Sequence, residues 1–106
     1  MNHEKDFDSY ERKSKRVFYK TYTLLAEMGT SDSTIDVMKP AIRRVFDKEF
    51  NVDELDFFEA SNRFIAKLYF ILGCHDVRKD KQKYVCQEVM EALVYDFEQS
   101  EERERS

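Results

Sequence analysis

The sequence contains little glycine, proline, histidine or cysteine, and no tryptophan. Its 106 residues include two Gly, one Pro, two Cys and two His. All-β sandwiches and barrels need turn residues at short intervals, so this composition favours helices. Rossmann and P-loop phosphate sites need closely spaced glycines, which excludes both. Two cysteines, Cys74 and Cys86, are too few for a disulfide framework, and we expect them to act as small apolar side chains.

Long apolar runs are also missing. No uninterrupted apolar stretch approaches the roughly 20 residues that span a membrane, and the N-terminal stretch lacks the apolar segment of a secretory signal. We therefore expect a cytoplasmic protein without membrane contact. The length suits one domain, and a hydrophobic content of 42% is enough for a core.

The spacing of apolar residues predicts four helices. Gly29 and Gly73 are predicted to be the left-handed residues that end the first and third helices. Ser33 and Asp36 resemble a capping box at the start of the second helix. The expected helices run from Asp6 or Asp8 to about Met28, from about Thr34 to Phe50, from a cap at Asn51 or Asp53 to Gly73, and from about Asp80 to Gln99.

The third predicted helix has the widest apolar face, so we expect it to be the central rod of a small four-helix bundle. Pro40 lies within the second helix, but the apolar positions keep their phase across it. This favours one continuous, bent helix that would make the bundle irregular, and a shorter helix beginning near Pro40 is the alternative. We expect residues 1–99 to form a single all-α domain and residues 100–106 to form a flexible charged tail.

The sequence shows no arrangement of residues typical of catalysis or metal binding. Cys74, His75 and Cys86 are candidate metal ligands, but structural zinc sites usually have four ligands in two closely spaced pairs. The Glu-x-x-His pattern of di-iron bundles does not occur. A cysteine nucleophile needs a base and an orienting partner, and no pattern indicates either. We therefore expect a protein that is not an enzyme and that holds no cofactor or metal.

Two basic clusters are candidate contacts for nucleic acid or for an acidic protein surface. A solvated helix face is the simpler explanation of both. The net charge of −4 and the interleaved Asp80 weaken the nucleic-acid interpretation. The first cluster, on the outer face of the first helix, is Arg12, Arg16 and Lys20, and the second, at the start of the fourth helix, is Arg78, Lys79, Lys81 and Lys83.

Aromatic residues on polar helix faces form the third set of candidates. Phe70 falls on the charged side of the third helix, and Tyr84 and Tyr95 fall on the polar side of the fourth. Aromatic residues flanked by charge are enriched in protein interfaces, although a single exposed aromatic residue is normal. The leading hypothesis is a non-enzymatic helical interaction module, such as a regulator, adaptor or immunity-type binder, that binds another protein and self-associates. The alternative is a nucleic-acid-associated accessory protein acting through the basic clusters.

Overall fold

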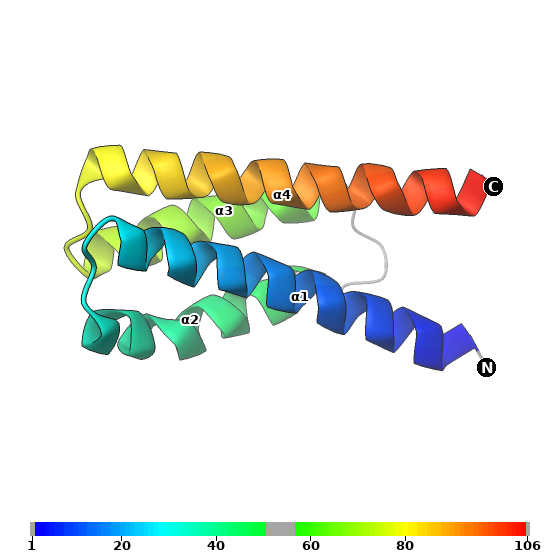
Figure 1. Ribbon diagram of the computed structural model, residues 1–106, viewed down its shortest axis with the longest axis horizontal. Helices are drawn as coiled ribbons and strands as arrows, with labels where there is room; N and C mark the ends of the chain where they lie inside the picture. The colour runs from blue at the N-terminus through cyan, green and yellow to red at the C-terminus, as the bar shows by residue number, and fades with distance from the viewer. Residues whose placement is uncertain (1, 51–56, 106) are drawn as a thin grey trace.

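Four helices form an antiparallel bundle in the computed structural model, which describes the backbone of residues 2–50 and 57–105 and the side chains of residues 14–50, 57–96 and 98 (Figure 1). The helices are α1 (Asn2–Glu27), α2 (Asp32–Phe50), α3 (Phe57–Cys74) and α4 (Lys79–Arg105). No strand occurs within these residues. The predicted all-α four-helix bundle is therefore confirmed. The helix α1 begins at Asn2, so the expected start of the first helix at Asp6 or Asp8 is wrong. The caps expected at Asn51 and Asp53 lie outside the residues described.

The helices occupy the corners of a square in chain order. Each packs against the helix before and after it, and α1 also packs against α4 (Figure 1). The expectation that α3 is a central rod is wrong, because α3 lies at a corner and contacts α2 and α4, with α1 diagonally opposite. Its wide apolar face is only partly covered in this position, since Phe58 and Tyr69 are 44% and 36% exposed at one edge of it.

Phe46 of α2 lies at the centre of an aromatic cluster in the core. Its ring packs edge-on against Phe18 of α1 and Phe64 of α3, both at 5.3 Å between centroids. Phe50 stacks at a tilt on the same ring at 4.5 Å. Edge-to-face aromatic packing fixes ring orientation as well as burying area. The helix α4 completes the core with four smaller side chains, Val85, Cys86, Val89 and Leu93.

Both short connections at the closed end of the bundle use the same helix-ending motif. The N–H of Thr30 donates to the Leu25 carbonyl at 2.9 Å, with Gly29 at φ 91°, as predicted for Gly29. After α3, however, the left-handed residue is Asp76 at φ 62°, and the Val77 N–H donates to the Leu72 carbonyl at 3.0 Å. The assignment of Gly73 to this role is wrong. The helix continues one residue beyond it because Asp76 tolerates the left-handed conformation.

The helix α2 is continuous through Pro40, so the alternative of a helix beginning near that residue is wrong. Its N-cap is Ser31 rather than Ser33, because the Ser31 hydroxyl accepts the Thr34 N–H at 3.3 Å. The helix α4 extends to Arg105, beyond the predicted end at Gln99. Alternating glutamate and arginine in residues 101–105 are good helix formers, which accounts for the extension. The flexibility of this tail stays a prediction.

Candidate interaction surfaces

Phe70 is the most exposed large apolar residue in the described helix α3, with 73% of its surface accessible. It lies on the outward face of the helix, where Arg63 donates to Glu59 at 3.0 Å one turn apart. Three residues before Phe70, Lys67 forms an ion pair with Glu49 of α2, whose side chain is 7% exposed. Residues three apart share a helix face. Phe70 therefore lies beside the line of contact between α2 and α3.

Tyr84 and Tyr95 lie on α4 and are 49% and 57% exposed. Eleven residues separate them, which places them on one stripe about 16 Å apart along the helix. Glu88 lies on the same stripe and pairs with Lys20 of α1 at 3.6 Å. The two tyrosines therefore lie on the side of α4 that faces α1.

The structure separates the three predicted interface residues into two surfaces. Phe70 lies beside the α2–α3 contact, whereas Tyr84 and Tyr95 lie beside the α1–α4 contact, and these are opposite sides of the square. One flat partner surface cannot cover all three. We call the region around Phe70 the Phe70 surface and the stripe on α4 the tyrosine stripe.

The predicted basic cluster of α1 faces α4 rather than open solvent. Arg16 pairs with Asp96, a carboxylate that is only 4% exposed, and Lys20 pairs with Glu88. These cations are balanced by carboxylates of the neighbouring helix, so their positions have a structural explanation. The side chain of Arg12 lies outside those described.

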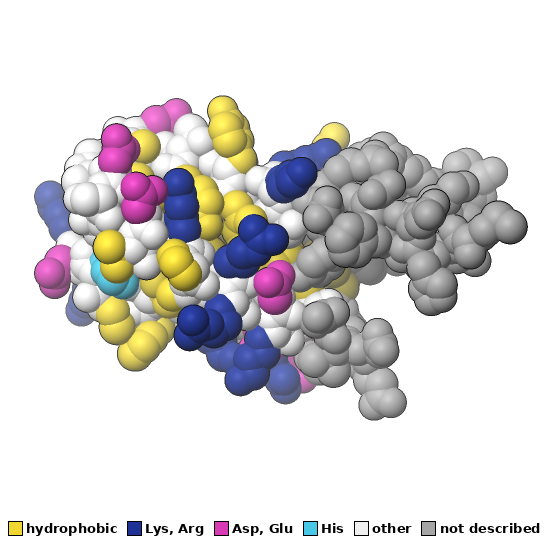
Figure 2. Space-filling model, turned by 90° about the horizontal axis from the view of Figure 1, so that it is seen from below, with side chains coloured by type: hydrophobic (Ala, Val, Ile, Leu, Met, Phe, Trp, Pro, Cys, Tyr) yellow, Lys and Arg dark blue, Asp and Glu magenta, His cyan; other side chains and the backbone are white. Residues whose placement is uncertain are grey.

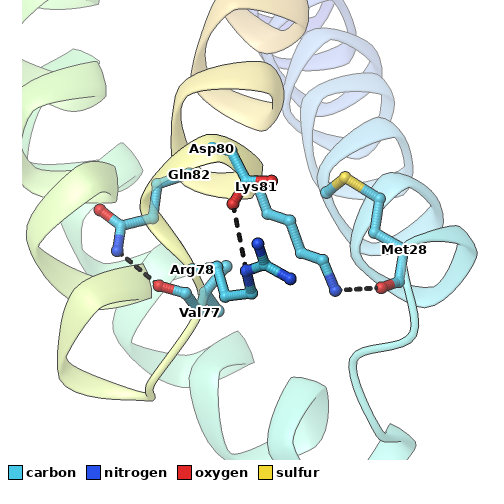
Figure 3. Close-up of polar contacts among 6 residues, drawn as sticks. All are labelled: Met28, Val77, Arg78, Asp80, Lys81 and Gln82. Atoms are coloured by element: carbon cyan, nitrogen blue, oxygen red, sulfur yellow. Dashed lines mark hydrogen bonds and ion pairs between the residues drawn. The ribbon is translucent and has the colours of Figure 1, made fainter.

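The second basic cluster is partly explained by the end of α1 (Figure 3). Lys81 reaches across to the C-terminus of α1, where its Nζ donates to the Met28 carbonyl at 2.6 Å. A cation there satisfies an otherwise unpaired carbonyl and complements the negative end of the α1 dipole. Arg78 pairs with Asp80 at 3.4 Å. Lys79 and Lys83 are exposed and make no ion pair with any residue that the structure describes.

The candidate ligands Cys74, His75 and Cys86 are not gathered into a metal site in the described part of the chain. Cys86 is buried in the core, and burial raises its thiol pKa to about 12, which keeps it protonated at neutral pH. Cys74 is exposed near the end of α3. No group of three or more potential metal ligands occurs among the residues whose placement is described.

A groove between α1 and α2 was not singled out by the sequence reasoning. It has a volume of about 520 Å³. Lys39 lines it and lies over the Tyr22 ring of α1 at 5.2 Å. Beyond the lining residues, Arg43 lies over the Phe18 ring of α1 at 6.0 Å. Burial raises the pKa of Tyr22, and the nearby Arg43 opposes that shift. The residues that line this α1–α2 groove are Tyr19, Tyr22, Thr23, Ala26, Asp32, Ile35, Asp36 and Lys39.

Only the spacing of the residues could have indicated the groove. On each of the two helices the lining residues repeat at i, i+3, i+4 and i+7, which is one helical stripe. The stripe on α1 includes Tyr19, whose side chain is 73% exposed. Because the sequence does not show which stripes of two helices meet, the groove is evident only in the folded chain.

No family of proteins matches this chain, and comparison with curated proteins and with solved structures found no match either. Over the residues described, none of the four helices has the combined length and hydrophobicity needed to cross a membrane.

Proposed function

We propose that this protein is a non-enzymatic interaction module that binds another protein through the Phe70 surface and self-associates. The observation that carries the proposal is the 73% exposure of Phe70 on a helix face that also carries the exposed Glu59–Arg63 ion pair. Large aromatic residues at the centre of a charged rim are enriched among residues that dominate binding energy. Within this proposal the protein acts in the cytoplasm as a regulator, adaptor or immunity-type binder.

The surroundings of Phe70 support binding rather than folding as its role. Glu59 and Arg63 pair with each other at 3.0 Å, so the rim is polar and already satisfied. A partner that covers Phe70 would not leave these charges unpaired, which lowers the cost of desolvating the surface. The tyrosine stripe offers a second, separate contact on the other side of the bundle.

Retention of a partner by three forms of the full chain tests the proposal. Wild type, Phe70→Glu and Gln87→Glu are each immobilised, and the proteins retained from the native host are identified by mass spectrometry. Gln87→Glu is the matched control because it adds the same charge at an exposed position of α4. We expect one protein to be retained by wild type and by the control but not by Phe70→Glu. The same retained proteins for all three forms would contradict a binding role for Phe70.

A thermal melt separates loss of binding from loss of folding. Exposed substitutions away from special features change stability by about 0.5 kcal/mol or less. Phe70→Glu is therefore expected to melt within a few degrees of wild type. A much lower melting temperature would show that Phe70 supports the fold.

Nucleic-acid binding is the less favoured function, because Arg16, Lys20 and Lys81 are engaged by groups of the protein itself. A titration with short DNA and RNA duplexes tests it. Binding that weakens steeply as salt is added would restore that function.

A further inference from the structure

The charges along the α1–α2 groove change sign from one end to the other. Asp32 and Asp36 line it toward the turn that joins the helices, Lys39 follows one turn further along α2, and Arg43 lies one turn beyond the lining residues. Within the chain Lys39 pairs with Asp36 at 3.1 Å and Arg43 with Asp47 at 3.9 Å. Both of these ion pairs are exposed, so the same charges are accessible to a second copy. Seen from below, acidic side chains gather toward the turn end of the bundle, and basic side chains lie mainly toward the middle with an acidic one among them (Figure 2). A surface of this kind is complementary to itself when one copy is reversed relative to the other.

The groove also combines a protruding side chain with a small one. Tyr19 stands at its rim with 73% of its surface exposed. Ala26, two turns further along the same stripe of α1, also lines the groove and is exposed. A protruding ring and a small exposed side chain two turns apart on one face allow the ring of each copy to pack on the small side chain of the other.

We infer that two copies of this chain pair face to face through their α1–α2 grooves, with the helices of one copy antiparallel to those of the other. The two-fold axis lies in the plane of contact and crosses the helices. It places Tyr19 of one copy against Ala26 of the other. It also places Asp32 opposite Arg43 and Asp36 opposite Lys39, twice in each dimer.

The Tyr19–Ala26 contact between the α1 helices and the two charge pairs between the α2 helices agree on one axis. In this antiparallel pair, α1 of one copy contacts α1 of the other, and α2 contacts α2. The residue numbers of two contacting positions therefore add up to one constant for α1 and to another for α2. The Tyr19–Ala26 contact centres the axis between Tyr22 and Thr23, and the two charge pairs centre it between Val37 and Met38. Within one chain Tyr22 lies beneath Lys39, so these two centres are at nearly the same height of the bundle.

The size of the face predicts a weak dimer. The shorter helix, α2, has 19 residues and is about 28 Å long, and two adjacent helices are about 20 Å wide. The contact therefore covers roughly 550 Å² per copy, less than the roughly 800 Å² of a standard stable interface. We expect a dissociation constant in the micromolar range or higher. This second-copy contact rests on the proposed self-association, and it leaves the Phe70 surface free for a different protein.

Exchanging charges between the copies tests the geometry. Asp32→Lys and Arg43→Glu each place like charges opposite each other twice in a homodimer. In an equimolar mixture, Lys at position 32 of one copy faces Glu at position 43 of the other, and Arg43 of the first faces Asp32 of the second. Sedimentation velocity is measured for wild type, each variant alone, the mixture, Gln87→Glu as the matched control, and Phe70→Glu as the variant of the other candidate surface. Thermal melts confirm that each variant is folded.

We expect each variant alone to dimerise at least about tenfold more weakly than wild type, and the mixture to recover most of the loss. Gln87→Glu is expected to dimerise as wild type does. A mixture no better than either variant alone would overturn the antiparallel contact. A wild-type chain that is monomeric at all concentrations would also overturn the contact, but it would leave the proposed binding of a different protein through Phe70 in place. A dimer abolished by Phe70→Glu and unaffected by charge reversal would also overturn it, while leaving the proposed function in place.

Discussion

The ion pair between Arg16 and Asp96 gives a direct test of whether the basic face of α1 is structural. Asp96 is 4% exposed, so its carboxylate has left water, whereas the Arg16 side chain is 59% exposed. Removing one partner of a fully buried pair costs about 3–5 kcal/mol. Because solvent screens the exposed end of Arg16, we discount this to about 2 kcal/mol, near the upper range for a charged hydrogen bond.

The assay is urea unfolding of Arg16→Ala followed by circular dichroism, with Lys15→Ala as the matched control. Lys15 is an exposed neighbour on α1, and its removal is expected to change stability by about 0.5 kcal/mol or less. The variant Asp96→Asn completes a double-mutant cycle, and we expect a coupling of about 1–2 kcal/mol between the two positions. If Arg16→Ala is as stable as Lys15→Ala, Arg16 does not support the fold and the basic face is free to bind other molecules.

Three further predictions concern stability. Gly73→Ala should raise the free energy of unfolding by about 0.5–1 kcal/mol in urea unfolding, because a Cβ there meets only Gln82 at 3.6 Å; a lower value would mean that the helix end shifts. Asp76→Gly should add about as much by relieving the left-handed conformation at φ 62°, and an unchanged midpoint would argue against that strain. Burial raises the pKa of the Cys86 thiol to about 12, against an ordinary 9.0. Below pH 9 the thiol is protonated in both states and does not change the free energy of unfolding. Between pH 9 and pH 12 only the unfolded thiol ionises, so the free energy of unfolding falls by about 1.4 kcal/mol per pH unit. Cys86→Ala should lack this part of the alkaline loss, and an identical pH profile for both proteins would refute the assignment.

Helix existence was predictable from the sequence because each helix has a clear apolar stripe and the chain contains few residues that interrupt helices. Gly29 marks a real helix end, since its φ of 91° is a conformation that glycine adopts without strain. The prediction that Gly73 ends the third helix in the left-handed conformation was wrong, because Asp76 takes that conformation instead. The turn at Asp76 is closed by the Val77 N–H, which donates to the Leu72 carbonyl at 3.0 Å, and it brings Val77 into the core.

The arrangement of the helices could not be predicted from their separate faces. The apolar arc of α3 is wide enough for a central rod, yet a square bundle leaves Phe58 and Tyr69 at its edge half-covered. The role of Lys81 was hidden for the same reason. A cation in the first turn of a helix opposes its own dipole, and only the position of the α1 C-terminus, 53 residues earlier in the chain, explains it.

The positions of the candidate interaction surfaces could be predicted only in part from the sequence. The sequence indicated that Phe70, Tyr84 and Tyr95 leave the core, and all three are exposed. It did not show that they lie on two opposite sides of the bundle, nor that Tyr19 borders a groove with α2. Those relations depend on which helices are neighbours, and the order α1–α2–α3–α4 around the square is a property of the whole chain.

The molar mass of the full chain as a function of concentration tests most directly whether the outer surfaces of this bundle serve association. Light scattering is recorded from low micromolar to near-millimolar protein. We predict a mass that rises from the monomer value of 12.8 kDa toward twice that value. A mass that stays at 12.8 kDa throughout would contradict self-association.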